Sequence, residues 1–351
     1  RCNLPHVRVL HFKIEIARVK INAISMDEQS GIEVVVFVIG ESSRPQNWSL
    51  FGYRESTTPE LDKKDGIYKF DNMCTTAPLT AIAVPSMLSF ESINNWESIV
   101  SNKSLVSVLR AAGYETYWLS TQEVDGFGGI IPHIAMEAEY QKYFSRSYDG
   151  ALLPEFNKIL LHGNKKQAVF IHTKGSHFDY ARRYPEDFNI FKTISNNRAN
   201  RLVAEYNNSI LYTDWLLGQF INQLQMMKKT SILIYSSDHG ENLMDDDRKL
   251  LGHGFGHEYD LSTSAFIWVS SGFDEKKSMK TSKLKKYENT QVSISSLPHT
   301  LVDILGVNYG EYKSTNSLVS DDLLPSKCLY KKGSSDIFSF DFQNTKINNS
   351  K

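Results

Sequence analysis

The stretch EVVVFVIG, residues 33–40, is the clearest β-strand signal of the chain and ends directly at Glu41. Its run of β-branched and aromatic residues predicts a buried strand. Four other runs have the same character and lie at residues 114–120, 167–173, 231–237 and 264–270. These runs predict the strands of one large sheet.

Segments of helical pattern separate the runs. Residues 103–113 form one such segment, which ends in Gly113, and residues 199–229 form a longer one with large apolar side chains at helical spacing. Strands that alternate with helices are typical of an α/β fold with a mostly parallel sheet. No Pro-, Gly- or Ser-rich linker divides the chain, so we expect one continuous sheet.

The composition limits the class of protein. Of the 351 residues, 41% are hydrophobic and 23% are charged, which is typical of a globular protein, and the net charge is −1. We expect no nucleic-acid partner, because such proteins carry a basic surface. No segment reaches the ~20 consecutive apolar residues of a membrane span. Six lysines within residues 275–286 predict a solvated loop, or else a loop that contacts anionic lipid or sugar phosphate.

Ionisable residues follow three of the predicted strands. Glu41 follows the first strand, His177 comes shortly after the third, and Asp238 and His239 follow the fourth. Ligands of open parallel sheets bind at the carboxyl ends of the strands, so these groups can converge on one site. Carboxylate and imidazole ligands together suit Zn²⁺ or Mn²⁺. The sequence therefore predicts a metal site at this edge of the sheet.

Each of these residues also has a simpler interpretation. Glu41 alone could be a helix N-terminal acid, His177 a loop histidine and Asp238 the cap of the following turn. The motif GHGFGH adds His253 as a further candidate, whereas its His257 is expected to be structural or exposed. The joint placement of the groups after predicted strands favours the metal site.

A candidate nucleophile lies between the first and second strands. The stretch LTAIAVPSML, residues 79–88, predicts a short helix with Thr80 at its start. The N-terminus of such a helix would stabilise an anion. A threonine hydroxyl becomes a good nucleophile only when a base or a metal lowers its pKa. The simpler interpretation of Thr80 is an ordinary hydroxyl at a helix start.

Five segments, in order, resemble the catalytic domain of the phosphoethanolamine transferases. They are VVVFVIGESSRPQNWSLFGYRESTTPEL (34–61), TAPLTAIAVPSMLS (76–89), GSHFDYARRYP (175–185), SSDHGENL (236–243) and LGHG (251–254). The resemblance runs from about residue 31 to about residue 310. It implies the α/β fold of the alkaline phosphatase and sulfatase superfamily, with helices on both faces of the sheet.

The resemblance also implies roles for individual residues. The zinc ligands would be Glu41, Thr80, Asp238 and His239. Thr80 would in addition be the nucleophile. His177 and His253 would hold the substrate phosphate or a second metal ion. Weaker candidates for substrate contacts are Glu241, His172 and Gln122.

The implied reaction transfers phosphoethanolamine from phosphatidylethanolamine to lipopolysaccharide or lipooligosaccharide, on a core sugar or lipid A, through a phosphothreonine. The family further implies an inner-membrane domain that this chain lacks, with the catalytic domain in the periplasm. Residues 1–30 would then lead out of the membrane, residues 31–332 would form the catalytic domain, and residues 333–351 would be a weakly packed tail. We expect a monomer.

Two departures from the family pattern bear on the acceptor. Lipid A-modifying members often carry a disulfide at the positions of Thr76 and Ser86, and Cys74 has no partner nearby in the sequence. The pairing of Cys2, Cys74 and Cys328 stays open. The motif SHFD, residues 176–179, resembles members that act on core sugars.

Other functions within and outside the superfamily stay open. Cys74 is not followed by the Pro and Arg of a formylglycine motif, which disfavours a sulfatase. A glycerol phosphate transferase, a metal-dependent phosphodiesterase and a non-catalytic glycolipid-binding protein are the remaining alternatives.

Overall fold

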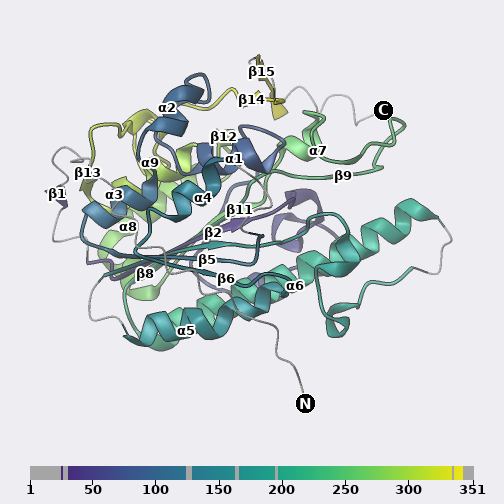
Figure 1. The fold of residues 1–351 in the computed structure, drawn as a ribbon, viewed down its shortest axis with the longest axis horizontal. Helices are drawn as coiled ribbons and strands as arrows, with labels where there is room; N and C mark the ends of the chain where they lie inside the picture. Colours follow the sequence, from purple (N-terminus) through teal and green to yellow (C-terminus); the bar gives the residue numbers. More distant parts are fainter. Residues whose placement is uncertain are drawn as a thin grey trace.

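The centre of the molecule is a seven-stranded sheet with the strand order β3-β11-β8-β2-β7-β5-β6 (Figure 1). The computed structural model describes residues 25–26, 31–123, 129–162, 166–193, 197–333 and 336–342. In sequence order the strands of this sheet are β2 (Val34–Gly40), β3 (Ile67–Lys69), β5 (Glu115–Ser120), β6 (Tyr140–Tyr143), β7 (Gln167–His172), β8 (Ser231–Ser237) and β11 (Ala265–Val269).

Strand β2 occupies the middle of the sheet because its sequence can be buried on both faces. It pairs in parallel with β7 and with β8, and β5 and β6 continue the parallel order. Val35, Phe37 and Ile39 face one hydrophobic core, whereas Val36 and Val38 face the other. This alternation follows from the two-residue period of a strand.

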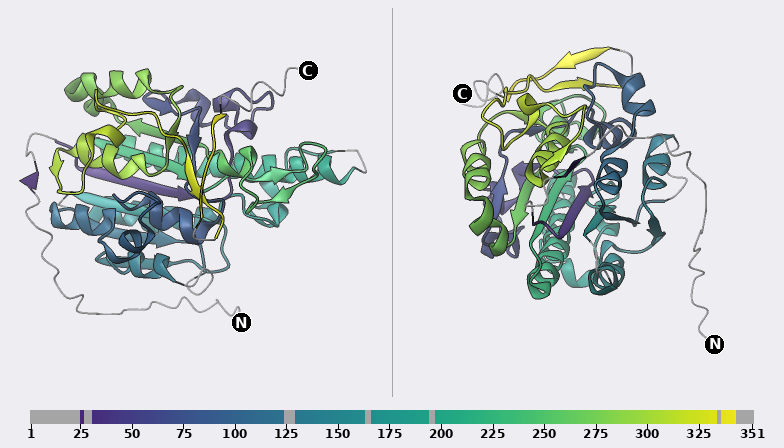
Figure 2. Two further views of the ribbon diagram at one scale, coloured as in Figure 1. Left: turned by 90° about the horizontal axis from the view of Figure 1, so that it is seen from above. Right: turned by 90° about the vertical axis from the view of Figure 1, so that its left-hand side faces the viewer.

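Helices cover both faces of the sheet (Figures 1 and 2). One core contains residues of α1 (Thr80–Met87), α3 (Leu105–Ala111), α4 (Ile130–Ala135), α8 (Ser271–Lys286) and α9 (Ser296–Leu305). Helix α2 (Trp96–Ser101) packs against α1. The opposite core lies under α5 (Leu153–His162) and the long α6 (Arg198–Met227). A short helix, α7 (Glu258–Leu261), follows the GHGFGH motif.

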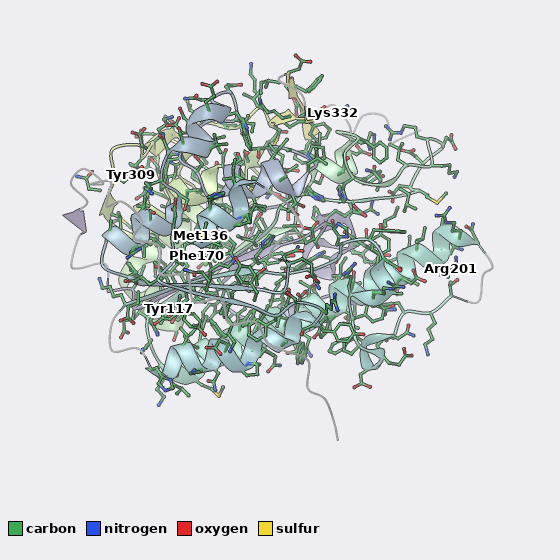
Figure 3. The ribbon with its side chains drawn as sticks, viewed as in Figure 1. Tyr117, Met136, Phe170, Arg201, Tyr309 and Lys332 are labelled. Carbon is green, nitrogen blue, oxygen red and sulfur yellow. A yellow bond between two sulfur atoms is a disulfide. The ribbon has the colours of Figure 1, made fainter. Side chains whose placement is uncertain are left out.

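Short strand pairs surround the central sheet. They are β1 (Ser25–Met26) with β13 (Val307–Asn308), β4 (Met73–Cys74) with β12 (Val292–Ser293), β9 (Asn242–Leu243) with β10 (Leu251–Gly252), and β14 (Leu329–Lys331) with β15 (Ile337–Ser339). Figure 3 labels Phe170 of β7, a fully buried side chain of the core beside α1 and α3.

The predicted fold class is confirmed. All five predicted strands are present, and both faces of the sheet carry helices. One predicted strand differs in direction, since β11 runs antiparallel to β8. Within the described residues no helix is both long and apolar enough to cross a membrane.

The lysine-rich segment 275–286 is part of helix α8 and not a loop, so the prediction of a loop was wrong. Lys280 and Lys283 form ion pairs with Asp303 and Asp321. The Lys280 pair is half-buried, whereas Asp321 is exposed, so two of the six lysines are engaged in pairs within the chain.

Two short strand pairs include residues of the segments that were predicted to flank the catalytic domain. Within residues 333–351, which were expected to be weakly packed, β15 pairs with β14. Within residues 1–30, β1 pairs with β13. The segment VRVLHFKIEIARVK, predicted to lead out of the membrane, lies outside the described residues.

Cys74 and Cys328 form a disulfide across a sequence separation of 254 residues. Cys74 has no partner nearby in the sequence, as expected, but it has one in space, because Cys328 comes from the C-terminal part of the chain. Since its sulfur is already bonded, Cys74 cannot serve as the precursor of a formylglycine nucleophile.

Candidate active site

The carboxyl ends of β2 and β8 bring the predicted metal ligands together. Gly40 and Ser237 are paired in register, so the next residues, Glu41 and Asp238, emerge side by side. His239 follows, and the exposed fraction of all three side chains is 0%. One ligand atom from each residue lies within 4.8 Å of the others. The three residues therefore form a compact buried donor set, as the sequence predicted.

The hydrogen bonds of these residues fit a cation. Asp238 Oδ1 accepts bonds from the backbone N–H groups of Ser42 and His239, whereas Asp238 Oδ2 is buried without a hydrogen-bond partner. His239 Nδ1 donates to the Gly240 carbonyl oxygen, 2.8 Å away. In this tautomer His239 Nε2 carries no proton, and its lone pair is available to a metal ion. Nε2 lies 3.4 Å from Glu41 Oε1 and 3.5 Å from Asp238 Oδ2. A neutral imidazole held in this tautomer is a common metal ligand.

The electrostatics also fit a cation. Burial, together with the nearby charge of Asp238, raises the pKa of Glu41 well above its ordinary value. Two buried carboxylates of like charge are unfavourable unless a proton or a metal ion neutralises them. A dication with nitrogen and oxygen ligands would remove this cost, and such a donor set suits Zn²⁺.

Thr80 is the first residue of α1 and contacts this donor set. Its hydroxyl donates to Glu41 Oε2 at 3.1 Å, and Thr80 Oγ1 lies 3.3 Å from His239 Nε2. The hydroxyl of Thr75 donates to the Asp238 carbonyl oxygen at 2.5 Å and so ties the segment before α1 to the end of β8. The predicted nucleophile and the predicted metal ligands thus share one site.

Two glycines permit the close packing of this site. A Cβ atom on Gly240 would lie 2.1 Å from the Tyr259 carbonyl oxygen, and one on Gly175 would lie 2.8 Å from the Glu41 carbonyl oxygen. Both contacts are with backbone and cannot relax easily. Gly240 therefore lets the chain turn directly after His239, and Gly175 lets the loop after β7 approach Glu41.

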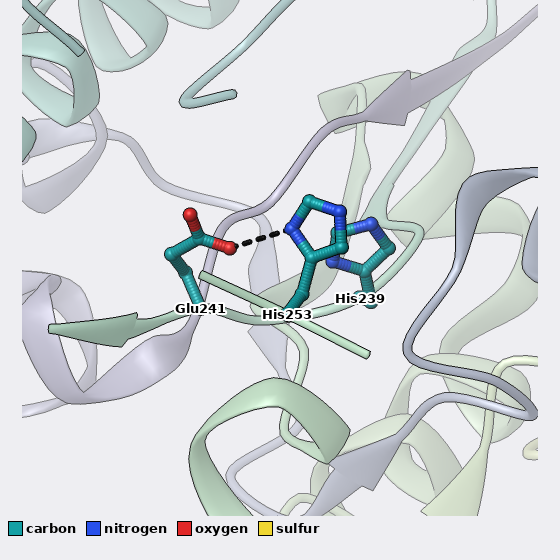
Figure 4. Close-up of side chains that lie close together, drawn as sticks. All are labelled: His239, Glu241 and His253. Atoms are coloured by element: carbon teal, nitrogen blue, oxygen red, sulfur yellow. Dashed lines mark hydrogen bonds and ion pairs between the residues drawn. The ribbon is translucent and has the colours of Figure 1, made fainter. Parts of the chain in front are cut away.

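Glu241 lies beside the donor set and supports His253 (Figure 4). His253 Nδ1 is 2.8 Å from Glu241 Oε2, and the Tyr180 hydroxyl donates to Glu241 Oε1 at 2.7 Å. Burial lowers the pKa of His253, but the hydrogen bond and charge of Glu241 outweigh it and raise that pKa to about 9. Glu241 is fully buried, so it orients His253 and does not present a free carboxylate to a substrate.

Two histidine rings border the donor set. The ring of His253 lies 4.2 Å from that of His239 and 5.8 Å from that of His177, measured between centroids. His177 Nδ1 donates to the Phe178 carbonyl oxygen, and burial lowers the pKa of His177. The two rings therefore differ in charge at neutral pH, because the pKa of His253 is raised and that of His177 is lowered. His239, Glu241 and His253 also form a second cluster of metal-binding type.

The weaker candidates take interior positions. His172, at the end of β7, is 1% exposed, its ring packs edge-on against Trp118, and burial lowers its pKa to about 4. Gln122 donates from Nε2 to Glu41 Oε2 at 3.2 Å and to the Thr173 carbonyl oxygen at 2.9 Å. Gln122 thus orients a predicted metal ligand, and a direct contact of His172 with substrate stays a prediction.

Sequence reasoning gave no role to Tyr180 or Thr75, which the structure places against Glu241 and Asp238. Both lie inside or next to the segments that resemble the transferases, but neither is a carboxylate or an imidazole that follows a predicted strand. His257 caps helix α7 together with Asp260, in line with its expected structural role.

The fold and the site define a member of the sulfatase family. The chain matches that family over residues 33–307 and belongs to it. It is 28% identical over 319 residues to the phosphoethanolamine transferase EptC of Escherichia coli K12, covering 84% of this chain and 54% of EptC. The resemblance to phosphoethanolamine transferases is confirmed. The chain spans about half the length of the curated relatives it matches.

Solved structures agree in fold. The C-terminal periplasmic domain of Escherichia coli EptC superposes with a TM-score of 0.83 at 24% identity, covering 91% of this chain and 95% of that domain. The same domain has been solved in complex with zinc. The soluble domain of lipooligosaccharide phosphoethanolamine transferase A from Neisseria meningitidis superposes with a TM-score of 0.74 at 24% identity, covering 84% and 95%.

Proposed function

We propose that this chain is the catalytic part of a zinc-dependent phosphoethanolamine transferase. The donor is phosphatidylethanolamine, and the acceptor is a hydroxyl of lipopolysaccharide or lipooligosaccharide, on a core sugar or lipid A. One observation carries the proposal: the Thr80 hydroxyl lies at a helix N-terminus within hydrogen-bond distance of both Glu41 and His239. A hydroxyl so placed is set up for nucleophilic attack.

Glu41, Asp238 and His239 would hold the zinc ion, with Thr80 beside them. When bound, zinc supplies Lewis acidity that lowers the pKa of the Thr80 hydroxyl and offsets charge on a phosphoryl group. The free Oδ2 atom of Asp238 and the tautomer of His239 support this ligand set. Gln122 and Ser42, which both donate to Glu41, keep that carboxylate oriented.

In the first step, Thr80 Oγ1 forms a bond to the donor phosphorus, and the bond from phosphorus to the diacylglycerol oxygen breaks. The Thr80 proton passes to Glu41 Oε2, to which it is already hydrogen-bonded. The leaving oxygen takes a proton from the imidazolium of His253, which Glu241 keeps protonated at neutral pH. Diacylglycerol leaves, and phosphoethanolamine stays esterified to Thr80.

In the second step, an acceptor hydroxyl attacks the same phosphorus and gives its proton to His253. The bond from phosphorus to Thr80 breaks, and Thr80 recovers its proton from Glu41. His253 thus acts as acid and then as base. His177, across from His253, and the N–H groups at the start of α1 offer further hydrogen bonds to the phosphoryl oxygens.

We place the chain in the periplasm, attached to the inner membrane through a part of the protein outside this sequence. The disulfide of Cys74 and Cys328 supports an oxidising compartment. The relatives of known structure are described as C-terminal periplasmic domains. A single catalytic domain contains every residue of the proposed mechanism, which favours a monomer.

Intact-protein mass spectrometry tests the proposal. The zinc-loaded chain, incubated with phosphatidylethanolamine, should gain the mass of one phosphoethanolamine group, and peptide mapping should locate it on Thr80. The Thr80→Ala variant should gain nothing, whereas Thr80→Ser should still be modified. Addition of lipooligosaccharide should discharge the modified chain, with the group recovered on the glycolipid. Discharge to water alone would contradict a transferase and indicate a phosphodiesterase.

A further inference from the structure

The C-terminal hairpin, here residues 329–333 and 336–339 with strands β14 and β15, lies next to the nucleophile segment. Cys328 directly precedes β14 and is joined by the disulfide to Cys74, on the strand that leads toward α1. The backbone N–H of Lys331 donates to the Thr76 carbonyl oxygen at 2.9 Å. Figure 1 shows β14 and β15 above α1 at the edge of the molecule. A covalent bond and a backbone hydrogen bond therefore fix the hairpin near Thr80.

Leu79, the residue before Thr80, connects the hairpin to the site. A Cβ atom on Gly333 would lie 3.6 Å from Leu79 Cδ1, and one on Gly254 would lie 3.8 Å from Leu79 Cδ2. The Leu79 side chain is therefore in contact range of the hairpin on one side and of the loop that carries His253 on the other.

The same loop also touches the hairpin directly. The Tyr330 hydroxyl donates to the Gly256 carbonyl oxygen at 3.3 Å. A Cβ atom on Gly256 would lie 2.1 Å from Lys332 Cε and 2.7 Å from Tyr330 Cε2, so only glycine lets these side chains pack there. Gly256 follows His253 by three positions. The hairpin thus forms one wall beside the two elements that carry Thr80 and His253.

The wall is basic and aromatic. Lys331 Nζ lies 5.9 Å from the ring of Trp96, and Lys332 Nζ lies 5.5 Å from the ring of Phe338, which stacks on Tyr330. Figure 3 labels Lys332 at this edge of the molecule. Among the residues that the structure describes, no carboxylate pairs with Lys331 or Lys332, unlike the paired lysines of α8.

We infer that the C-terminal hairpin is a wall of the acceptor subsite, and that Lys331 and Lys332 bind phosphate groups of a phosphorylated sugar chain. The identity of the acceptor rests on the proposed function. Lysine ammonium groups are common phosphate ligands, and flat aromatic rings offer an apolar surface to a sugar. The hairpin contacts the segment that leads to Thr80, so an extended ligand that carries phosphate groups can contact both the lysines and Thr80. The acceptor glycan is such a ligand.

Binding of a deacylated, phosphorylated lipooligosaccharide core to the full chain tests this inference without turnover. Isothermal titration is done on wild type, on Lys331→Ala/Lys332→Ala, and on Lys63→Ala. The control removes one exposed lysine from the 3-10 helix Leu61–Lys63, which packs against α6. We expect about tenfold weaker binding in the double variant, with a shallower salt dependence, and no change in the control.

Two further comparisons make the test specific. A phosphatase-treated core should bind wild type and the double variant alike, because the groups that the lysines contact are gone. Cys328→Ser keeps both lysines but frees the hairpin, and it should weaken binding of the phosphorylated core as well. Equal thermal unfolding midpoints of the double variant and Lys63→Ala show that the fold is intact.

Equal affinity of the double variant and Lys63→Ala for the phosphorylated core would overturn the inference. It would also be overturned if the double variant lost binding only to vesicles of anionic phospholipid, since the lysines would then contact the bilayer. If the proposed function is wrong, mass spectrometry will find no phosphoethanolamine on Thr80 of wild type. The glycan-binding measurement does not depend on that result and can still be interpreted.

Discussion

Glu41 lies with Asp238 in a pair of fully buried carboxylates, and burial and the charge of Asp238 raise the pKa of Glu41 well above normal. This arrangement is unfavourable in the metal-free protein and favourable once a dication is bound. The charge of Glu41 should therefore favour metal binding and, in the metal-free protein, lower the stability of the fold.

Glu41→Gln tests this conflict. The amide oxygen can still accept from Thr80 and Gln122, but the charge is lost. We expect zinc affinity to fall at least about tenfold, since even groups that only support metal ligands cost that much. In the metal-free state the variant should unfold at a higher temperature than wild type, and a given zinc concentration should raise the unfolding temperature of wild type more than that of the variant.

Zinc titration and thermal unfolding measure both effects. Glu55→Gln, at an exposed carboxylate, is the matched control and should behave as wild type in both. Stoichiometric zinc in Glu41→Gln with unchanged affinity would remove Glu41 from the ligand set.

His253 owes its raised pKa to Glu241. Burial alone would lower that pKa, but the hydrogen bond to Glu241 and its charge raise it from 6.5 to about 9 in the metal-free chain. The folded state therefore binds a proton more tightly than the unfolded state. The stability from this pair is full below pH 6.5 and is lost as the pH rises through about 9.

Glu241→Gln should lower the pKa of His253, as followed by NMR of its ring protons, and should flatten the loss of stability between pH 6.5 and 9. Tyr180→Phe is the control, because it removes a hydrogen bond to Glu241 but leaves the charge that faces His253. An unchanged His253 pKa in Glu241→Gln would show that another group holds the proton.

At the scale of elements, the strands buried on both faces were predictable because their sequences contain continuous runs of apolar residues, many of them β-branched. β2 carries seven buried residues without a charge, and β8 is buried throughout as well. Strands β3 and β6 were not predicted, since each is only three or four half-buried residues whose pairing depends on neighbours far along the chain. The antiparallel direction of β11 likewise follows from connection and not from local pattern.

The site was predictable to the extent that it lies at strand ends. Glu41, Asp238 and His239 meet because β2 and β8 are adjacent parallel strands. The role of Glu241 could not be predicted from the sequence. A carboxylate that faces a substrate and one that is paired with Tyr180 and His253 have the same appearance in a sequence.

In helix α8, the pattern of charges in the sequence did not predict the structure or the contacts of the lysines. Its lysines suggested a loop that contacts anions, but Lys280 and Lys283 are paired with carboxylates from α9 and from the segment beyond it. Among the described residues, Lys331 and Lys332 have no carboxylate partner and lie near the proposed site, but they form no long run in the sequence. Position relative to the nucleophile, which the sequence does not show, distinguishes the two sets.

At the scale of the whole molecule, the Cys74–Cys328 disulfide closes a loop with a sequence separation of 254 residues. β4 pairs in parallel with β12, and the disulfide adds the C-terminal hairpin to the same edge. The beginning and the end of the domain are thus fastened together beside the nucleophile segment. A cross-link of this length constrains the unfolded chain more than a short one does.

Cys328→Ser should therefore lower the free energy of unfolding by about 2 to 5 kcal/mol, measured by urea denaturation of the metal-free chain. A reductant should destabilise wild type by a similar amount and leave Cys328→Ser unchanged, because the variant has no bond left to break. Cys2→Ser keeps the Cys74–Cys328 pair and is the control for loss of a thiol. If the reductant lowered the stability of wild type and Cys328→Ser equally, the destabilisation would not come from this bond. The hydrogen bonds of the hairpin to Thr76 and Gly256 would remain in both proteins.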